Sequence, residues 1–428
     1  MDSIYRPRRI PLAMLAAILG TLVGCSALAQ TSTEPLLQLS NLVYQGSFRL
    51  PQMNCGSNYA CFSYGGTALT YDAADNSLYV VGDPYGQLST EISIPAVVNT
   101  ASLNALNTAS LLQPFADPTN GERNLVNTAS SVGKKIGGQL IFGGKLIVSV
   151  YSYYDANGTQ STSHFVASPN LSNETQVAGP FRVGTVYPGF VSGYMTTVPT
   201  EWQATFGGPA FTGNCCLNII AFQSNGPSVS TFDPSQLGVL LPLPAAVLVG
   251  YPHSEPLGSG WGTQSALFNG TTQVTGVVFP PGTRSVLFFG RQGVGPFCYG
   301  EGTTNAALNG QPTGQGDISC YDPANGNKGV HAYPYVYQIW AYDANDLAAV
   351  KSGSKSAYQI APYGVWTFHL PFESADQHLL GGTGFDPTNN LIYLSQLNED
   401  ANSNPIIHVF KVNGGLAVPE APGAVQAQ

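Results

Sequence analysis

The chain has 428 residues, of which 9% are charged, 43% are hydrophobic and 49 are glycine, and its formal net charge is −9. The apolar content argues against disorder, and the scarcity of charge with many aromatic and β-branched residues predicts sheet rather than helix. The acidic balance, without a basic cluster beyond Lys134–Lys135, argues against nucleic acid as a partner.

Residues 1–29 have the features of an export signal. Three arginines precede a short apolar run that is too short to span a bilayer. The motif "LVGC", Leu22 to Cys25, resembles a bacterial lipobox, in which the cysteine is lipidated, whereas "ALAQ" resembles a site for cleavage after Ala29. We therefore expect an outer-membrane or cell-surface lipoprotein that meets the membrane only through its lipid, or alternatively a periplasmic or secreted protein.

Six of the seven cysteines follow the leader, and an even number in an exported chain predicts disulfides. Pairing by proximity predicts the bonds Cys55–Cys61, Cys215–Cys216 and Cys298–Cys320. Other connectivities remain open at this stage, because spacing alone does not determine which cysteines pair.

Five apolar runs have the same form, a short strand that ends in a polar or aromatic residue. They are "LYVVGD" to Asp83, "LIVSVY" to Tyr151, "NIIAFQ" to Gln223, "VLFFGR" to Arg291 and "LIYLSQ" to Gln396. The first four ends are about 70 residues apart, which suits a repeated unit of four strands and predicts a β-propeller.

The predicted fold is all-β, a single propeller of five four-stranded blades over residues 41–413. Residues 30–40 form a linker before it, and residues 414–428 form a flexible tail. The N-terminal run "VYQGSFRLP" closes the last blade as its fourth strand and removes free sheet edges. A six-blade ring with one degenerate blade and a pair of β-sandwiches are the alternatives.

Two segments resemble a known group of proteins. "EWQATFGGPAFTG", Glu201 to Gly213, and "QIWAYDANDLAAVKSG", Gln338 to Gly353, are similar to segments of uncharacterised exported bacterial proteins. The strand-turn-strand units are also similar to YVTN/NHL-type propeller repeats. The resemblance implies a propeller fold and no particular activity, so no catalytic residue is carried over from it.

The ends of the five runs are expected to converge near the propeller axis and to form a pocket. Its candidate catalytic residues are the carboxylates Asp83, Glu399 and Asp400, which could serve as nucleophile or general acid and base. The candidate ligand-binding residues combine aromatic rings, amides, imidazoles and one guanidinium for an anionic group, and they are Tyr151, Tyr154, Gln223, His253, Trp261, Arg291, His331 and Gln396.

A long insertion, rich in glycine and asparagine, lies between Arg291 and Tyr337. The expected Cys298–Cys320 bond closes a loop within it. Long ordered insertions are often lids or binding loops, although a surface ornament is the alternative.

Standard catalytic motifs are absent from the sequence. The favoured hypothesis is a binding module for a glycan or an extracellular protein on the axial face, and the alternative is a glycan-active hydrolase or lyase. Redox chemistry at Cys215–Cys216 is a third hypothesis. No cofactor is expected, and a structural Ca²⁺ in the axial channel is left open, since no run of ligands demands it.

Overall fold

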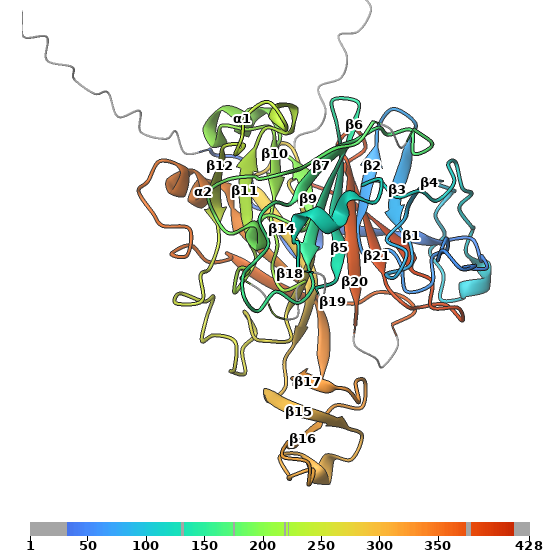
Figure 1. Cartoon of the computed structure of the whole chain (residues 1–428), viewed down its shortest axis with the longest axis vertical. Helices are drawn as coiled ribbons and strands as arrows, with labels where there is room; N and C mark the ends of the chain where they lie inside the picture. Colours follow the sequence, from blue (N-terminus) through green and yellow to red (C-terminus); the bar gives the residue numbers. More distant parts are fainter. Residues whose placement is uncertain are drawn as a thin grey trace, which may run out of the picture.

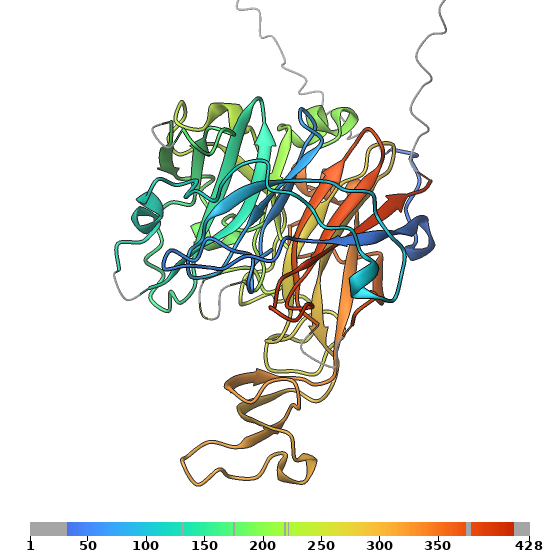
Figure 2. The ribbon, with the colours of Figure 1, turned by 90° about the vertical axis from the view of Figure 1, so that its right-hand side faces the viewer.

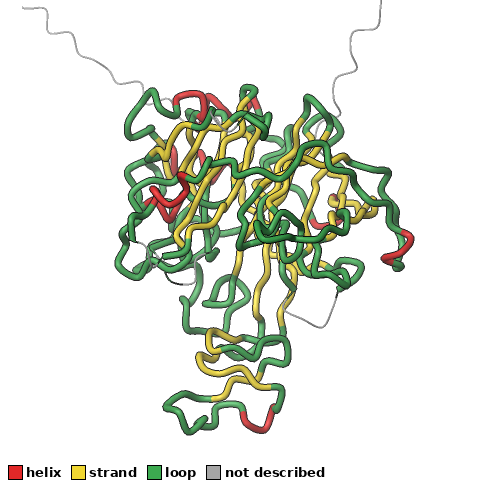
Figure 3. The backbone as a smooth tube through the Cα atoms, turned by 45° about the vertical axis from the view of Figure 1, so that its right-hand side comes forward, coloured by secondary structure: helices red, strands yellow, loops and turns green. Residues whose placement is uncertain are grey.

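The computed structural model describes residues 32–129, 132–173, 176–217, 220, 222–373 and 378–414. The predicted leader with Cys25 and nearly all of the predicted tail lie outside these residues. In the described part of the chain, no helix is long and apolar enough to cross a membrane. Strands and loops make up most of these described residues, which include two α-helices, α1 (Thr200–Phe206) and α2 (Ala344–Lys351) (Figure 3).

Five large sheets and one small sheet contain the named strands. The first strands of the large sheets are β2 (Leu69–Asp72), β5 (Lys134–Phe142), β9 (Met195–Thr197), β13 (Gln273–Val278) and β20 (Leu380–Asp386). The second strands are β3 (Ser77–Val81), β6 (Lys145–Ser152), β10 (Ala210–Thr212), β14 (Ser285–Gly293) and β21 (Leu391–Gln396). Each second strand pairs antiparallel with the first strand of its sheet.

The outer strands complete these sheets. The third strands are β4 (Ser89–Ser93), β7 (His164–Ala167), β11 (Val229–Phe232), β18 (Tyr335–Asp343) and β22 (Ile406–Val412). The fourth strands are β8 (Ala178–Phe181), β12 (Ala245–Val249), β19 (Gly364–Phe368) and β1 (Leu42–Arg49). As the sequence predicts, the N-terminal strand β1 pairs antiparallel with β22 and becomes the outer strand of the last sheet.

The sheet of β2, β3 and β4 departs from the predicted four strands, because it has only three. Residues 107–116 lie beside β4 and contact it through isolated bridges, Ile92 with Leu111 and Ser89 with Ala116. Pro114 in this segment has no N–H for a regular ladder, which helps to explain why the segment does not form a fourth strand.

Similar aspartate turns connect the first and second strands of two sheets. Asp72 accepts a 2.9 Å hydrogen bond from the N–H of Ala74, and Asp386 accepts a 2.8 Å bond from the N–H of Thr388. Both aspartates are buried, and each carboxylate accepts a hydrogen bond from the backbone that a carbonyl group accepts in other turns. Asp72 and Asp386 therefore have a structural role in these turns.

The first strands of the five large sheets contact one another in a cycle, from β2 through β5, β9, β13 and β20 back to β2. A Cβ atom added to Gly276 of β13 would collide with Thr383 of β20, so glycine permits this close approach. A cavity of about 10 Å³ lies between these strands and is lined by residues of all five. This described cavity holds about one water molecule and is too small for the axial ligand predicted from the sequence.

The small sheet consists of β15 (Cys298–Thr303), β16 (Ser319–Tyr321) and β17 (Lys328–His331), and it belongs to the insertion between β14 and β18. It projects from the large sheets in two perpendicular views (Figures 1 and 2). Short 3₁₀ helices lie in the connections, and they are η1 (Leu39–Asn41), η2 (Leu103–Ala105), η3 (Glu122–Val126), η4 (Pro188–Phe190), η5 (Pro234–Gln236) and η6 (Ala306–Leu308).

Candidate functional site

A cavity of about 770 Å³ lies between the insertion and the ends of neighbouring large sheets. Its lining residues come from the loop after β6, the segment after β10, the approach to β13, the end of β14 and the insertion. They are Tyr153, Tyr154, Cys216, Leu217, Ile220, Gln223, Ser224, Asn225, Trp261, Phe268, Asn269, Gly270, Thr271, Thr272, Gln273, Arg291, Tyr299, Asn325, Asn327, Lys328, Gly329 and Val330. None of these described lining residues is an aspartate, a glutamate or a histidine.

Several aromatic side chains at this cavity are exposed, whereas Phe268 is buried. Trp261 is 42% exposed, Tyr299 is 52% exposed and Tyr154 is 50% exposed. The rings of Trp261 and Tyr299 have centroids 6.2 Å apart, and Phe297 packs edge-on against Trp261 at 5.2 Å. Exposed rings of this size in a concave site are suited to stacking against a ligand rather than to filling a core.

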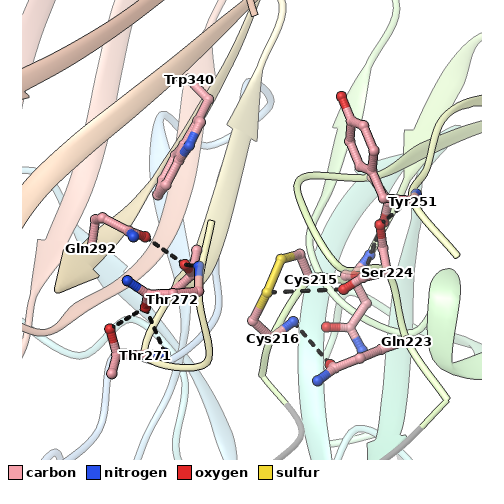
Figure 4. The surroundings of a disulfide bond; sticks show 12 residues. Cys215, Cys216, Gln223, Ser224, Tyr251, Thr271, Thr272, Gln292 and Trp340 are labelled. Atoms are coloured by element: carbon pink, nitrogen blue, oxygen red, sulfur yellow. Dashed lines mark hydrogen bonds between the residues drawn. A yellow bond between two sulfur atoms is a disulfide. The ribbon is translucent and has the colours of Figure 1, made fainter. Parts of the chain in front are cut away.

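One wall is built by a hydrogen-bonded group before β13 (Figure 4). Thr272 donates its hydroxyl hydrogen bond to Oε1 of Gln292, and Nε2 of Gln292 donates to the carbonyl of Ser265 at 2.6 Å. Thr271 donates to Oδ1 of Asn269 at 2.7 Å. These bonds fix the orientations of the threonine and amide side chains before any ligand binds.

A second wall contains the Cys215–Cys216 disulfide, which Figure 4 shows facing Thr271 and Thr272. Cys215 is fully buried, and Cys216 lines the cavity with a positive φ of 73°. The N–H of Cys216 donates to Oε1 of Gln223 at 2.9 Å, so the disulfide turn holds this lining amide. The predicted Cys55–Cys61 and Cys298–Cys320 bonds are also present, which confirms all three pairings.

Arg291 lies at the base of the insertion. It is 7% exposed, and its guanidinium Cζ lies 4.7 Å from the centroid of the Tyr335 ring. Tyr335 donates to Oδ2 of Asp322 at 2.6 Å, and the same oxygen lies 2.8 Å from Nδ1 of His331. Burial alone would raise the pKa of Asp322, but hydrogen bonds from His331 and Tyr335 outweigh it and lower that pKa.

The structure brings together four of the predicted ligand-binding residues, Tyr154, Gln223, Trp261 and Arg291, at this cavity. The other four do not line it. Tyr151 and His331 are buried, and His253 is an exposed residue of a separate turn. Gln396 is buried and bonded to His408 and Tyr337.

The predicted catalytic carboxylates lie elsewhere. Asp83 is buried and accepts a 2.7 Å bond from the N–H of Tyr85, which is a turn-forming role. Glu399 accepts from Tyr337 at 3.5 Å. Asp400 accepts hydrogen bonds from Gln52 and from two backbone N–H groups of its own loop. None of the three lines the cavity.

Several lining residues were not predicted as ligand-binding residues, chiefly the polar run from Asn269 to Gln273 and the insertion residues Tyr299, Asn325, Asn327 and Lys328. The run "FNGTTQ" immediately before a strand is a signal that could have identified the first group. The second group could not be placed from sequence, because the direction in which the insertion folds back is not encoded in a local pattern.

Carboxylate oxygens of Asp72, Asp75 and Glu91 lie within 4.8 Å of one another, away from the residues that line the cavity. Glu91 accepts hydrogen bonds from Ser77 and Gln113. Protein donors therefore already engage this group, and a structural Ca²⁺ stays an untested prediction.

Comparisons with known proteins give distant likenesses only. No family model matches the chain, and no curated protein matches it. An endo-arabinanase from Bacillus licheniformis is 10% identical, with 82% of this chain and 93% of that chain covered and a TM-score of 0.38. A glycosyl hydrolase from Bacteroides ovatus is 11% identical, with 91% and 97% covered and a TM-score of 0.40.

A β-propeller domain from Myceliophteria thermophila is 7% identical, with 87% of this chain and 100% of that chain covered and a TM-score of 0.32. Likenesses at these TM-scores assign neither a fold nor an activity to this chain. The function proposed below therefore rests on the cavity and its residues.

Proposed function

We propose that this protein is an exported carbohydrate-binding protein, whose five large sheets are the blades of one β-propeller. The cyclic contacts between the five first strands support the blade assignment, since each sheet packs against the next and β20 returns to β2. Export, with lipidation at Cys25 or cleavage after Ala29, agrees with the three disulfides.

The observation that carries the proposal is the composition of the 770 Å³ cavity. Its exposed rings, above all Trp261 and Tyr299, offer flat apolar surfaces that match the C–H face of a sugar. Its amides, such as Gln223 and Asn225, carry both donor and acceptor groups, as sugar hydroxyls require. A concave site that combines these two kinds of group favours a carbohydrate over a flat protein epitope.

The same composition argues against the hydrolase hypothesis. A glycosidase of the usual kind needs two carboxyl groups on either side of the bond that it cleaves. The described residues that line the cavity include no carboxylate, and Asp83, Glu399 and Asp400 belong to other parts of the structure. Binding without cleavage is therefore the function that this site supports best.

A glycan array probed with residues 31–428 tests the proposal, with Trp261→Ala as the paired variant. We expect binding to a defined set of glycans, and a loss of about tenfold or more in affinity when Trp261 is truncated, as for a buried aromatic anchor at an interface. Tyr85→Ala is the matched control, because Tyr85 is an exposed ring, 77% accessible, that does not line the cavity. Glycan binding that survives Trp261→Ala would place the site elsewhere. If the protein binds no glycan but binds an extracellular protein, the proposed carbohydrate ligand is wrong.

A further inference from the structure

We propose that the carbohydrate bound in this cavity is acidic, and that Arg291 binds its carboxylate or sulfate group. This inference rests on the proposed carbohydrate-binding function and adds the chemical class of the ligand. The chain as a whole has 24 acidic and 15 basic side chains. The cavity reverses that balance, because its described lining includes Arg291 and Lys328 and no acidic residue.

The protein positions Arg291 from two directions. Within the sheet, Arg291 of β14 is paired in register with Gln273 of β13 and with Tyr337 of β18. Below its guanidinium, the Tyr335 ring lies at 4.7 Å and is itself fixed by the hydrogen bond to Asp322. Stacking against a ring uses the face of a guanidinium, whereas its N–H donors lie in the plane, where carboxylate and sulfate oxygens bind in pairs.

Burial increases the effect of this charge. Arg291 is 7% exposed, so an ion pair formed there is screened by water much less than a surface pair. Lys328 lines the cavity from the insertion but is paired at 2.6 Å with Asp317 and is 48% exposed. Water screens an attraction to Lys328 more strongly than one to the buried Arg291, so Arg291 contributes more to the discrimination between charged and neutral ligands.

The surrounding residues point to a sugar acid rather than a simple anion. A free phosphate or sulfate ion would use the cations but would leave Trp261 and Tyr299 exposed. An acidic sugar uses each kind of group, since its ring face stacks on an aromatic side chain, its hydroxyls meet amides and its acid meets Arg291.

Calorimetric titration compares three probes, an oligogalacturonate, the same oligomer with its carboxyls methyl-esterified, and a sulfated galactan oligosaccharide. We expect an anionic probe to bind at least about tenfold more tightly than the esterified oligomer, as for hydrogen bonds to a charged group. We also expect that preference to shrink when the salt concentration is raised. Preference for the carboxylated or for the sulfated probe identifies which acid Arg291 binds.

Arg291→Ala should remove the preference and leave the weaker binding of the ester within about threefold, since only the charged contact is lost. Arg291→Lys is the second variant, because it disrupts the structure less and keeps the positive charge. It loses the paired N–H donors of the guanidinium, so we expect an intermediate preference for the anionic probes. Lys328→Ala should reduce the preference slightly. Lys355→Ala is its matched control, since Lys355 is also a half-exposed lysine, 46% accessible and ion-paired with Asp346.

The outcomes separate the two proposals. Equal binding of charged and esterified oligomers, both weakened by Trp261→Ala, would overturn the acidic ligand and leave carbohydrate binding intact. A preference for the anionic probes that is undiminished in both Arg291→Ala and Arg291→Lys would overturn the role of Arg291. If the protein binds no oligosaccharide, neutral or charged, in the titrations or on the array, the proposal of carbohydrate binding itself is wrong.

Discussion

Tyr335 of strand β18 donates a 2.6 Å hydrogen bond to Oδ2 of Asp322, in the insertion. Asp322 also accepts from His331, and the two side chains are 0% and 1% exposed. Nε2 of His331 lies 3.1 Å from the carbonyl oxygen of Asn327, and Asn327 lines the cavity. One buried group of residues thus connects the insertion, the ring beneath Arg291 and the edge of the cavity.

Asp322→Asn tests that connection. The change is nearly isosteric but replaces the carboxylate that accepts hydrogen bonds from Tyr335 and His331 with a neutral amide, and losing a buried hydrogen bond to a charged group costs about 1.5–3 kcal/mol. We expect the insertion to open more readily, so that amide hydrogen exchange accelerates in residues 298–331 while the large sheets stay protected. Asp317→Asn, which breaks only the exposed pair with Lys328, is the control and should change the exchange little.

Loss of the Cys298–Cys320 bond should loosen the same segment. Cys298→Ser with Cys320→Ser removes a cross-link between residues 22 positions apart, which corresponds to about 3 kcal/mol in the loop-entropy description. We expect rapid proteolytic cleavage within the insertion and weaker binding of glycan, with little change in the melting temperature of the large sheets. An insertion that stays resistant to protease in the double variant would contradict this role.

Two buried histidines predict loss of stability in acid. Burial lowers the pKa of His408 to about 3 and that of His164 to about 3, whereas a histidine in the unfolded chain has a pKa of about 6.5. Between these values the unfolded chain binds more protons than the folded one, so stability is full above about pH 6.5 and falls as the pH is lowered. At pH 5 each histidine accounts for about 2 kcal/mol of that loss.

The contacts of His408 show how it remains neutral. Tyr44 donates to its Nδ1 at 3.1 Å, and its Nε2 donates to Oε1 of Gln396 at 2.6 Å. Urea unfolding at pH 7.5 and pH 5 should therefore show a smaller difference in His408→Gln than in the unmodified protein. His369→Gln serves as the control, because the His369 side chain is 80% exposed, and it should leave the difference unchanged.

Sequence reasoning identified the strand runs that lead to Asp83, Tyr151, Arg291 and Gln396, the disulfides and the pairing of the N-terminal strand with the last sheet. The run "NIIAFQ" is a wrong prediction, because the second strand of its sheet is β10 and, of the described residues of this run, Ile220 forms only an isolated bridge with Tyr154. The strands follow from local patterns, since a short apolar run such as "VLFFGR" is typical of a buried strand. The pairing of β1 with β22 joins distant parts of the chain and follows from the need to cover free sheet edges. The position of the site was less predictable. Alignment of strand ends indicated that five residues converge, but Gln396 is bonded to His408 and Tyr337, and only Gln223 and Arg291 reach the cavity.

The close packing of the first strands predicts strong sensitivity at their glycines. In Gly382→Ala, the new Cβ would collide with the backbone of Leu69 on the neighbouring strand β2, which cannot move aside as a flexible side chain can. Overpacking of this kind costs about 1–3 kcal/mol or more, so we expect a lower melting temperature or failure to fold. Gly326→Ala should be neutral, since no atom lies within 4 Å of its added Cβ.

Substitution of the carboxylates separates binding from catalysis. Asp83→Asn and Glu399→Gln keep a side-chain oxygen that can accept the bonds from Tyr85 and Tyr337, so folding should be preserved. Because neither residue lines the cavity, we expect both variants to bind the same glycans as the unmodified protein within about twofold, as for changes remote from an interface. Incubation of bound oligosaccharides should release no new reducing ends with any of the three proteins. Release by the unmodified protein that Asp83→Asn or Glu399→Gln abolishes would restore the hydrolase hypothesis and would require these carboxylates to reach a substrate outside the cavity.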